Sequence, residues 1–152
     1  MEIHLASTNE SIIRILSSIK YPYIKTYQCS CCSDPTPFDQ YKLYYIKWSN
    51  EFHKAKPTIP IKIDTIVSVL IVLHNDIKSW YTEPIVRSLG LGTVLLEHIC
   101  SLSNQLTITI PYDIYPYYES VYAIRILYKY KFRMVFEDKG EIRLVRGGND
   151  KK

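Results

Sequence analysis

No uninterrupted apolar run in this 152-residue sequence comes near the roughly 18 residues that a membrane-spanning helix needs. The first residues also lack the basic segment and the apolar stretch of a secretory signal. We therefore expect an intracellular protein, cytoplasmic or nuclear, with no membrane partner. In such a compartment its four cysteines should remain reduced.

The sequence also lacks a large excess of either charge, since its formal net charge is only +4 and no block of like charges occurs. A nucleic-acid-binding surface normally carries a stronger basic excess, so we expect no nucleic-acid partner. The modest excess does fit an anionic ligand or an acidic protein. Residues 147–152 predict a flexible tail, and residues 1–146 predict a single domain with its own core.

A metal-ligand pattern is missing as well. Cys29, Cys31 and Cys32 lie close together, but their spacing is poor for tetrahedral zinc. No second ligand pair lies nearby except His53, so we expect no metal. Cys100 falls on the apolar side of an expected helix and predicts a core thiol.

Apolar periodicity and β-branched runs predict alternating strands and helices. We expect strands over residues 1–6, 42–48, 65–73, 77–82, 105–110, 132–136 and 141–145. Helices are expected over residues 10–19, from Gly92 to Asn104, and over 120–130. The apolar side of the first helix should carry Ile12, Ile13, Leu16 and Ile19. Asn75-Asp76 and residues 138–140 predict tight turns, and residues 28–39 and 57–60 predict a loop and a linker.

The strand–helix–strand unit over residues 77–110 requires a parallel pair joined by a right-handed crossover, whereas the other strands pair antiparallel. The sequence therefore predicts a single-domain α/β fold with a mixed, mostly antiparallel sheet flanked by helices. A ligand is expected at the carboxyl ends of the parallel strands.

Residues 87–93, with the sequence RSLGLGT, lie directly between an expected strand and an expected helix. Glycines let the backbone approach an anion, and the first helical turn points free amides at the same place. Arg87 can add a charge-assisted hydrogen bond. The segment is neither a Walker loop nor a dinucleotide fingerprint, so it predicts a phosphate site or, alternatively, a merely structural turn. A β-branched residue at Gly90 or Gly92 should weaken binding and leave the fold intact.

This segment resembles the R/Q-x-x-G-x-G/A signature of the GCN5-related N-acetyltransferase (GNAT) superfamily, with Pro84 before it and Leu95-Leu96 after it. Residues 123–132, AIRILYKYKF, resemble the A-I-x-L-Y-x-x-x-G-F segment of the same family. The resemblance implies a sheet that splays between its fourth and fifth strands. It also implies transfer of an acetyl group from acetyl-CoA to a primary amine by direct attack.

A closer similarity, to the catalytic subunits of protein N-terminal acetyltransferases, implies a protein or peptide acceptor and an auxiliary subunit. Pantetheine would then pair with the edge of strand 77–82, and Tyr21, Pro22 and Tyr23 would line the peptide entrance. The positions that the resemblance assigns to acetyl-CoA are Trp80, Tyr81, Thr82, Arg87, Ser88, Leu89, Gly90, Leu91, Gly92, Thr93 and Ser120. Ser120 stands where the family has a helix-opening asparagine.

The proton donor departs from the family pattern. Leu127 occupies the position of the tyrosine that usually protonates the CoA thiolate, and Tyr128 lies about 100° further round an ideal helix. Either the helix is offset by one residue so that Tyr128 serves, or another group donates, or turnover is weak. The last case makes a catalytically weak CoA-binding or interaction subunit the second hypothesis.

The proton acceptor is also open. Asp76 falls where some relatives place a glutamate base on the fourth strand, although a plain turn residue is the alternative. The other candidates near the expected site are Tyr81, Glu83, Tyr117 and Tyr118.

Overall fold

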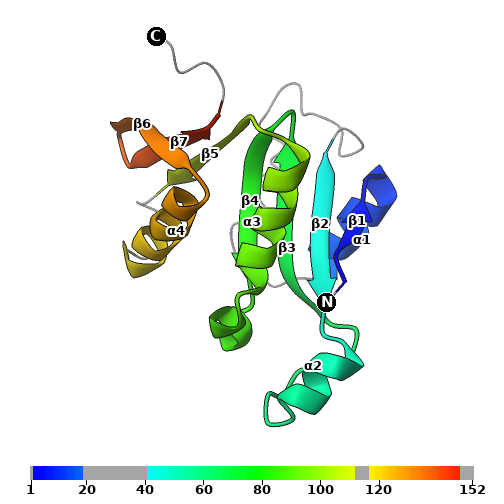
Figure 1. Ribbon diagram of the computed structural model, residues 1–152. Coiled ribbons are helices and arrows are strands. Elements are labelled where there is room, and N and C mark those ends of the chain that lie inside the picture. The colour runs from blue at the N-terminus through cyan, green and yellow to red at the C-terminus, as the bar shows by residue number, and fades with distance from the viewer. Residues whose placement is uncertain (1, 19–40, 112–116, 148–152) are drawn as a thin grey trace.

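The computed structural model describes residues 2–18, 41–111 and 117–147, and these residues form one seven-stranded sheet flanked by helices (Figure 1). The strands are β1 (His4–Ala6), β2 (Lys42–Lys47), β3 (Ile66–Leu73), β4 (Asp76–Thr82), β5 (Leu106–Pro111), β6 (Phe132–Asp138) and β7 (Glu141–Arg146). The helices are α1 (Asn9–Ser18), α2 (Asn50–Ala55), α3 (Leu91–Leu102), α4 (Tyr117–Lys129) and the 3-10 helix η3 (Pro84–Leu89). The strand order is β1-β2-β3-β4-β5-β7-β6.

Among the described strands, β4 and β5 run parallel and the other neighbouring pairs are antiparallel. This confirms the predicted fold class and the crossover through α3. Two apolar clusters stabilise the sheet from its two sides. α3 and α4 contribute to one cluster, and α1 contributes to the other. No helix in the described part of the chain is long and apolar enough to cross a membrane.

The hairpin between β3 and β4 turns one residue earlier than predicted. His74 and Asn75 take φ values of 50° and 68°, which is the pattern of a two-residue primed turn. Asp76 is therefore the first residue of β4, paired with Leu73. Asp76 therefore closes the turn as the first strand residue after it, and both its structural and its catalytic interpretation stay predictions.

The helices before β3 differ from the sequence prediction in two ways. Ile15 rather than Ile13 belongs to the buried side of α1, and Ile13 is 40% exposed. α2 was not predicted, because six residues are too short for a periodic pattern. Ser49 caps it by accepting a hydrogen bond from the Phe52 amide at 3.2 Å.

Candidate functional site

β4 and β5 separate soon after they meet. They pair only at Asp76 with Thr107 and at Ile77 with Ile108, whereas β4 continues to Thr82. From residue 78 onward, the edge of β4 that faces away from β3 has no strand partner within the described residues. Figure 1 shows the two strands diverging beside α3. An unpaired strand edge offers backbone amides and carbonyls to an extended ligand that carries amides of its own.

A β-bulge lies where β4 leaves β5. Val72 pairs with Ile77 and Ile71 pairs with Ser79, so Lys78 is the extra residue of β4. A bulge bends its strand and increases the local twist. It therefore accounts for part of the divergence, and short-range sequence patterns did not reveal it.

The chain from β4 to α3 is more ordered than the predicted loop. Pro84 opens the 3-10 helix η3. Its missing N–H costs no hydrogen bond, because the first N–H groups of a helix have no acceptor inside it. Gly90 then takes φ 79° and separates η3 from α3. An added Cβ at Gly90 would meet nothing within 4 Å, so the space beside it is open. We call residues 90–93 the α3 entry.

The α3 entry presents backbone amides in an arrangement that suits an anion. The first four N–H groups of a helix have no acceptor inside that helix. The Val94 amide is the first to bond back, to the Gly90 carbonyl at 3.0 Å. The N–H groups of Leu91, Gly92 and Thr93 precede it at the positive end of the helix dipole. These three amides and the open space beside Gly90 fit a phosphate group.

Gly92 brings this helix end against β4. A Cβ at Gly92 would lie 2.9 Å from Thr82 Oγ1 and 3.2 Å from Trp80 Nε1. Trp80 Nε1 also donates to the Gly92 carbonyl at 2.9 Å. The Thr82 hydroxyl is held in turn by a 2.8 Å hydrogen bond to Ser68 Oγ. The expectation that a β-branched residue at Gly92 would leave the fold intact is therefore wrong, because the side chain would collide with these groups.

Arg87 joins η3 to the end of β4. Its Nε donates to the Thr82 carbonyl at 2.9 Å, and its guanidinium lies 5.8 Å from the centre of the Tyr81 ring. The second contact is a cation–π arrangement. Arg87 thus fixes the geometry of the chain that leads into α3, in addition to the charge that the sequence suggested. Ser88 is exposed and Leu89 packs at the margin of the core.

Asp76 lies at the closed end of the split, where β4 and β5 still pair. Its Oδ1 accepts a hydrogen bond from Thr107 Oγ1 at 2.6 Å, and its Oδ2 is 2.9 Å from Lys78 Nζ. The carboxylate therefore ties β4 to β5. It stands six residues before Thr82, which is about 20 Å along an extended strand.

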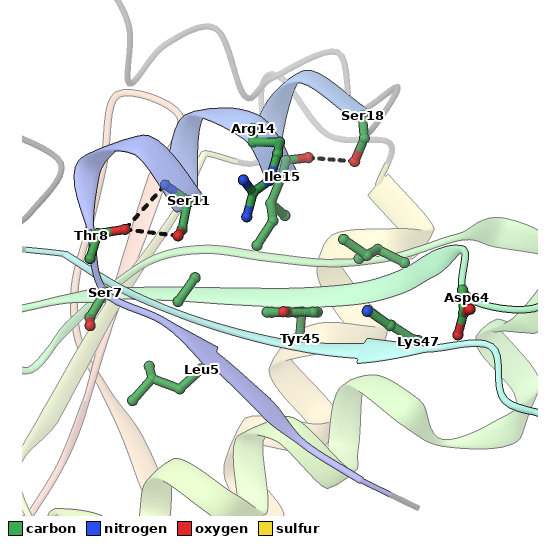
Figure 2. A pocket seen from close by; sticks show the side chains of 12 residues that line it. Leu5, Ser7, Thr8, Ser11, Arg14, Ile15, Ser18, Tyr45, Lys47 and Asp64 are labelled. Carbon is green, nitrogen blue, oxygen red and sulfur yellow. Dashed lines mark hydrogen bonds between the residues drawn. The ribbon is translucent and has the colours of Figure 1, made fainter.

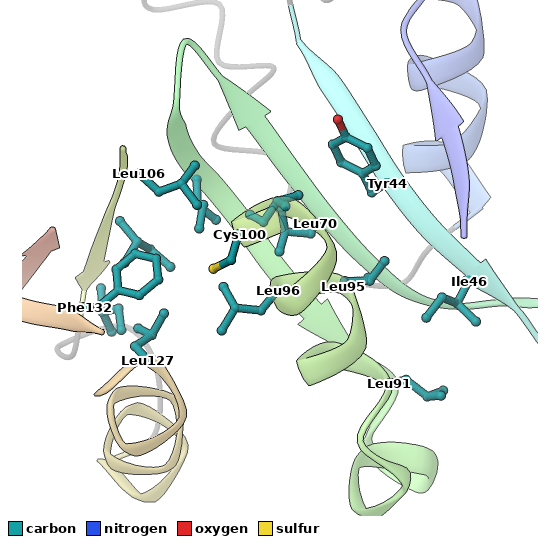
Figure 3. Close-up of a cluster of buried hydrophobic side chains, with 14 of the residues drawn as sticks. Tyr44, Ile46, Leu70, Leu91, Leu95, Leu96, Cys100, Leu106, Leu127 and Phe132 are labelled. Carbon is teal, nitrogen blue, oxygen red and sulfur yellow. The ribbon is translucent and has the colours of Figure 1, made fainter. Parts of the chain in front are cut away.

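The structure places Leu127 and Tyr128 on different sides of α4. Leu127 is fully buried, so its side of α4 faces the core, and Tyr128 is 48% exposed on another side. Figure 3 shows Leu127 beside Phe132 and pointing toward the cluster that includes Leu96 and Cys100. Tyr128 therefore stays a predicted proton donor, on an exposed side of α4.

Cys100 is a core residue, as the sequence predicted, and is only 7% exposed. Burial raises the pKa of the Cys100 thiol, and the Glu97 carboxylate acts in the same direction, against the opposing effect of Arg146. A raised pKa keeps the thiol neutral at neutral pH, which makes it a poor nucleophile.

Several predicted residues cannot be placed at the site. Tyr21, Pro22 and Tyr23 lie outside the described residues, as do Cys29, Cys31 and Cys32. α4 begins at Tyr117, so Ser120 lies inside this helix and does not open it. The side chains of residues 117–120 are likewise outside the description. In the rest of the chain, no group of three or more His, Cys, Asp or Glu side chains could hold a metal ion.

Sequence reasoning missed Ser79, next to the bulge. Its side chain is 4% exposed, and its hydroxyl has no hydrogen-bond partner within the described residues. A buried hydroxyl without a partner is uncommon. Its burial depends on its pairing with buried Ile71 in β3, which the sequence alone does not reveal.

A hollow of about 420 Å³ lies elsewhere, between α1 and the strands β1, β2 and β3 (Figure 2). Arg14, Lys47 and Asp64 line it together with the hydroxyl groups of Thr8 and Ser11. None of its lining residues belongs to β4, η3 or α3. It is therefore separate from the split and the α3 entry.

Solved structures of acetyltransferases share this fold. An acyl-CoA N-acyltransferase from Pseudomonas aeruginosa matches with a TM-score of 0.57 and 12% identity, over 96% of this chain and 100% of the other. The ribosomal-protein-S18-alanine N-acetyltransferase from Escherichia coli matches with a TM-score of 0.55 and 12% identity, over 99% of each chain. A GNAT-family acetyltransferase from Staphylococcus aureus matches with a TM-score of 0.52 and 12% identity, over 95% and 98%.

No family model matches the chain, and no curated protein matches its sequence. At these identities the likeness to solved structures concerns the fold. The predicted resemblance to the GNAT superfamily is thus confirmed at that level: the chain has the fold of these acetyltransferases.

Proposed function

We propose that this chain, which has the fold of the GNAT acetyltransferases, transfers an acetyl group from acetyl-CoA to a primary amine of a protein or peptide. The observation that carries the proposal is the split between β4 and β5, with the α3 entry at its open end. Diphosphate oxygens would accept hydrogen bonds from the amides of Leu91, Gly92 and Thr93. The pantetheine amides would pair with the free edge of β4 over residues 78–82.

The α3 entry supports the proposal that acetyl-CoA is the ligand, because its two glycines have different structural roles. Gly90 provides positive φ and open space beside the first helical turn. Gly92 lets that turn approach Trp80 and Thr82 at the end of the unpaired strand edge. The anion position and the strand edge therefore lie next to each other, as one elongated ligand with a charged end requires.

One of the similar structures suggests the class of acceptor. The similar enzyme from Escherichia coli is named for acetylating an alanine of ribosomal protein S18, and the acceptor there is an amine of a protein. Direct attack by the amine, without an acyl-enzyme, is the mechanism that the resemblance to the GNAT family implies. The acceptor is either an N-terminal amine or a lysine side chain, and an auxiliary subunit could present it.

A thiol-release assay tests the function. We expect CoA release from acetyl-CoA with peptides that carry a free N-terminus or a lysine, and mass spectrometry should find one added acetyl group. Peptides with both amines blocked are the control. Calorimetry runs in parallel, and no acetyl-CoA binding at millimolar concentration would rule the proposal out.

We predict that Asp76→Asn lowers kcat at least about tenfold with little change in KM if Asp76 is the general base. The carboxylate would take the proton as the amine attacks. Thr107→Val is the matched control, because it removes the 2.6 Å hydrogen bond to Asp76 and keeps the carboxylate. If both variants lose only thermal stability, and by similar amounts, Asp76 is a clamp between strands and not a base.

The second candidate function is a catalytically weak, CoA-binding subunit of a larger assembly. The burial of Leu127 at the position of the usual tyrosine donor favours it. Acetyl-CoA binding without CoA release over the whole peptide panel would select this function over the first.

A further inference from the structure

The hollow between α1 and the strands β1, β2 and β3 is lined by charged groups of both signs that do not neutralise each other. Arg14, Lys47 and Asp64 line it, and none of these three side chains makes a hydrogen bond or an ion pair within the described chain. The volume of about 420 Å³ lies within the range of small-molecule sites, roughly 300–1,000 Å³. We call this hollow the α1 hollow.

The helix supplies one of the two cations. α1 packs on the sheet through Ile15 and Leu16, which are 6% and 2% exposed. Residues three and four apart share a side of a helix, so Ser11, Arg14 and Ser18 form one row along the α1 hollow. Figure 2 shows Arg14 extending from α1 toward the strands. A guanidinium in this place presents its planar donors to a carboxylate.

Lys47 and Asp64 belong to the opposite wall (Figure 2). Lys47 lies two residues after Tyr45 on β2, and both line the α1 hollow. Asp64 precedes β3 and takes a φ of 74°, which side chains other than glycine seldom adopt. Its amide donates to the carbonyl of fully buried Trp48 at 2.7 Å. The core therefore fixes the backbone that carries the Asp64 carboxylate.

The pattern of charges indicates which ligand fits. Two cations stand against one carboxylate, and no other lining side chain carries a charge at neutral pH. A ligand with two carboxylates and one ammonium group would pair with all three, and charge-assisted hydrogen bonds are the strong ones. An acidic α-amino acid has this pattern. A dicarboxylate without an amine would leave Asp64 unpaired, and a neutral amino acid would leave one cation unpaired.

We propose that the α1 hollow binds an acidic α-amino acid, with its carboxylates on Arg14 and Lys47 and its ammonium group on Asp64. The lining includes no residue of β4, η3 or α3. The proposal therefore does not depend on acetyl-CoA or on acetyl transfer.

Calorimetry with L-glutamate tests the site. We expect a Kd of about 1 mM or lower. Arg14→Gln and Lys47→Gln should each weaken binding at least about tenfold, because each removes one charge-assisted contact. Lys54→Gln is the control, since Lys54 is an exposed cation on α2 and does not line the α1 hollow. Circular dichroism checks that each variant is folded. A wild type that binds no glutamate at about 10 mM would overturn the proposal.

Asp64 gives the sharper result, because it should recognise only the ammonium group. Asp64→Asn keeps the size of the side chain, and asparagine tolerates the positive φ. This variant should bind glutamate at least about tenfold more weakly than the wild type does. Its affinity for glutarate, which is glutamate without the amine, should be unchanged or higher. A wild type that binds glutarate as tightly as glutamate, or an equal loss of both ligands in Asp64→Asn, would overturn the assignment of an amino acid.

Discussion

Replacing Gly92 with valine is expected to abolish measurable acetyl-CoA binding and to lower the free energy of unfolding by about 1–3 kcal/mol. The Cβ alone would lie 2.9 Å from Thr82 Oγ1 and 3.2 Å from the Trp80 ring nitrogen. The indole is rigid and is itself bonded to the Gly92 carbonyl, so the start of α3 must move away from β4. Calorimetry with acetyl-CoA and thermal unfolding measure the two effects.

Gly90 provides the matched comparison. Gly90→Ala places its Cβ in open space, so its cost is the positive φ of 79°, about 1–2 kcal/mol. Gly90→Asn should be milder, because asparagine tolerates that conformation. Thr82→Ala should partly rescue Gly92→Ala in stability, since it removes the nearer of the two clashing atoms. Equal effects at both glycines, or no rescue, would contradict the close packing of α3 on β4.

Leu127→Ala is expected to be the most destabilising single change in α4, by about 2–5 kcal/mol. Leu127 is fully buried beside Phe132 and belongs to the cluster that also contains Leu96 and Leu106 (Figure 3). Because β4 and β5 share only two residue pairs, this cluster is the main apolar connection between the two halves of the sheet. Denaturant unfolding measures the loss.

A leucine on the exposed side of the neighbouring helix is the control. Leu102→Ala, at a position that is 61% exposed, should change the unfolding free energy by no more than about 0.5 kcal/mol. If Leu127→Ala costs no more than Leu102→Ala, the two halves are joined in another way.

The fold was largely predictable because its signals are local or depend on chain order. β-branched runs predicted β3, and the strand–helix–strand order fixed the parallel pair β4 and β5. Lys139 and Gly140 turn the final hairpin with positive φ, close to where the sequence placed the turn. α2 was missed because it is held by one serine cap and the stacking of Trp48 on Phe52.

The candidate site was predictable only in part. The glycine motif located the start of α3, because it is a continuous segment whose chemistry can be interpreted residue by residue. The close approach of Gly92 to Trp80, the bulge at Lys78 and the contact of Asp76 with Thr107 all depend on pairing between strands. The burial of Leu127 follows the apolar spacing of the predicted helix, but the exact rotation of α4 against the sheet depends on packing. A single sequence fixes that rotation only approximately.

The most direct measurement is an amide NMR titration of the ¹⁵N-labelled chain with CoA. We predict saturable shifts, at millimolar CoA or below, in the amides of Leu91, Gly92 and Thr93 and in those of β4 residues 78–82. Shifts confined to other segments, or no shifts at about 10 mM CoA, would contradict the assignment of the split and the α3 entry as one ligand site.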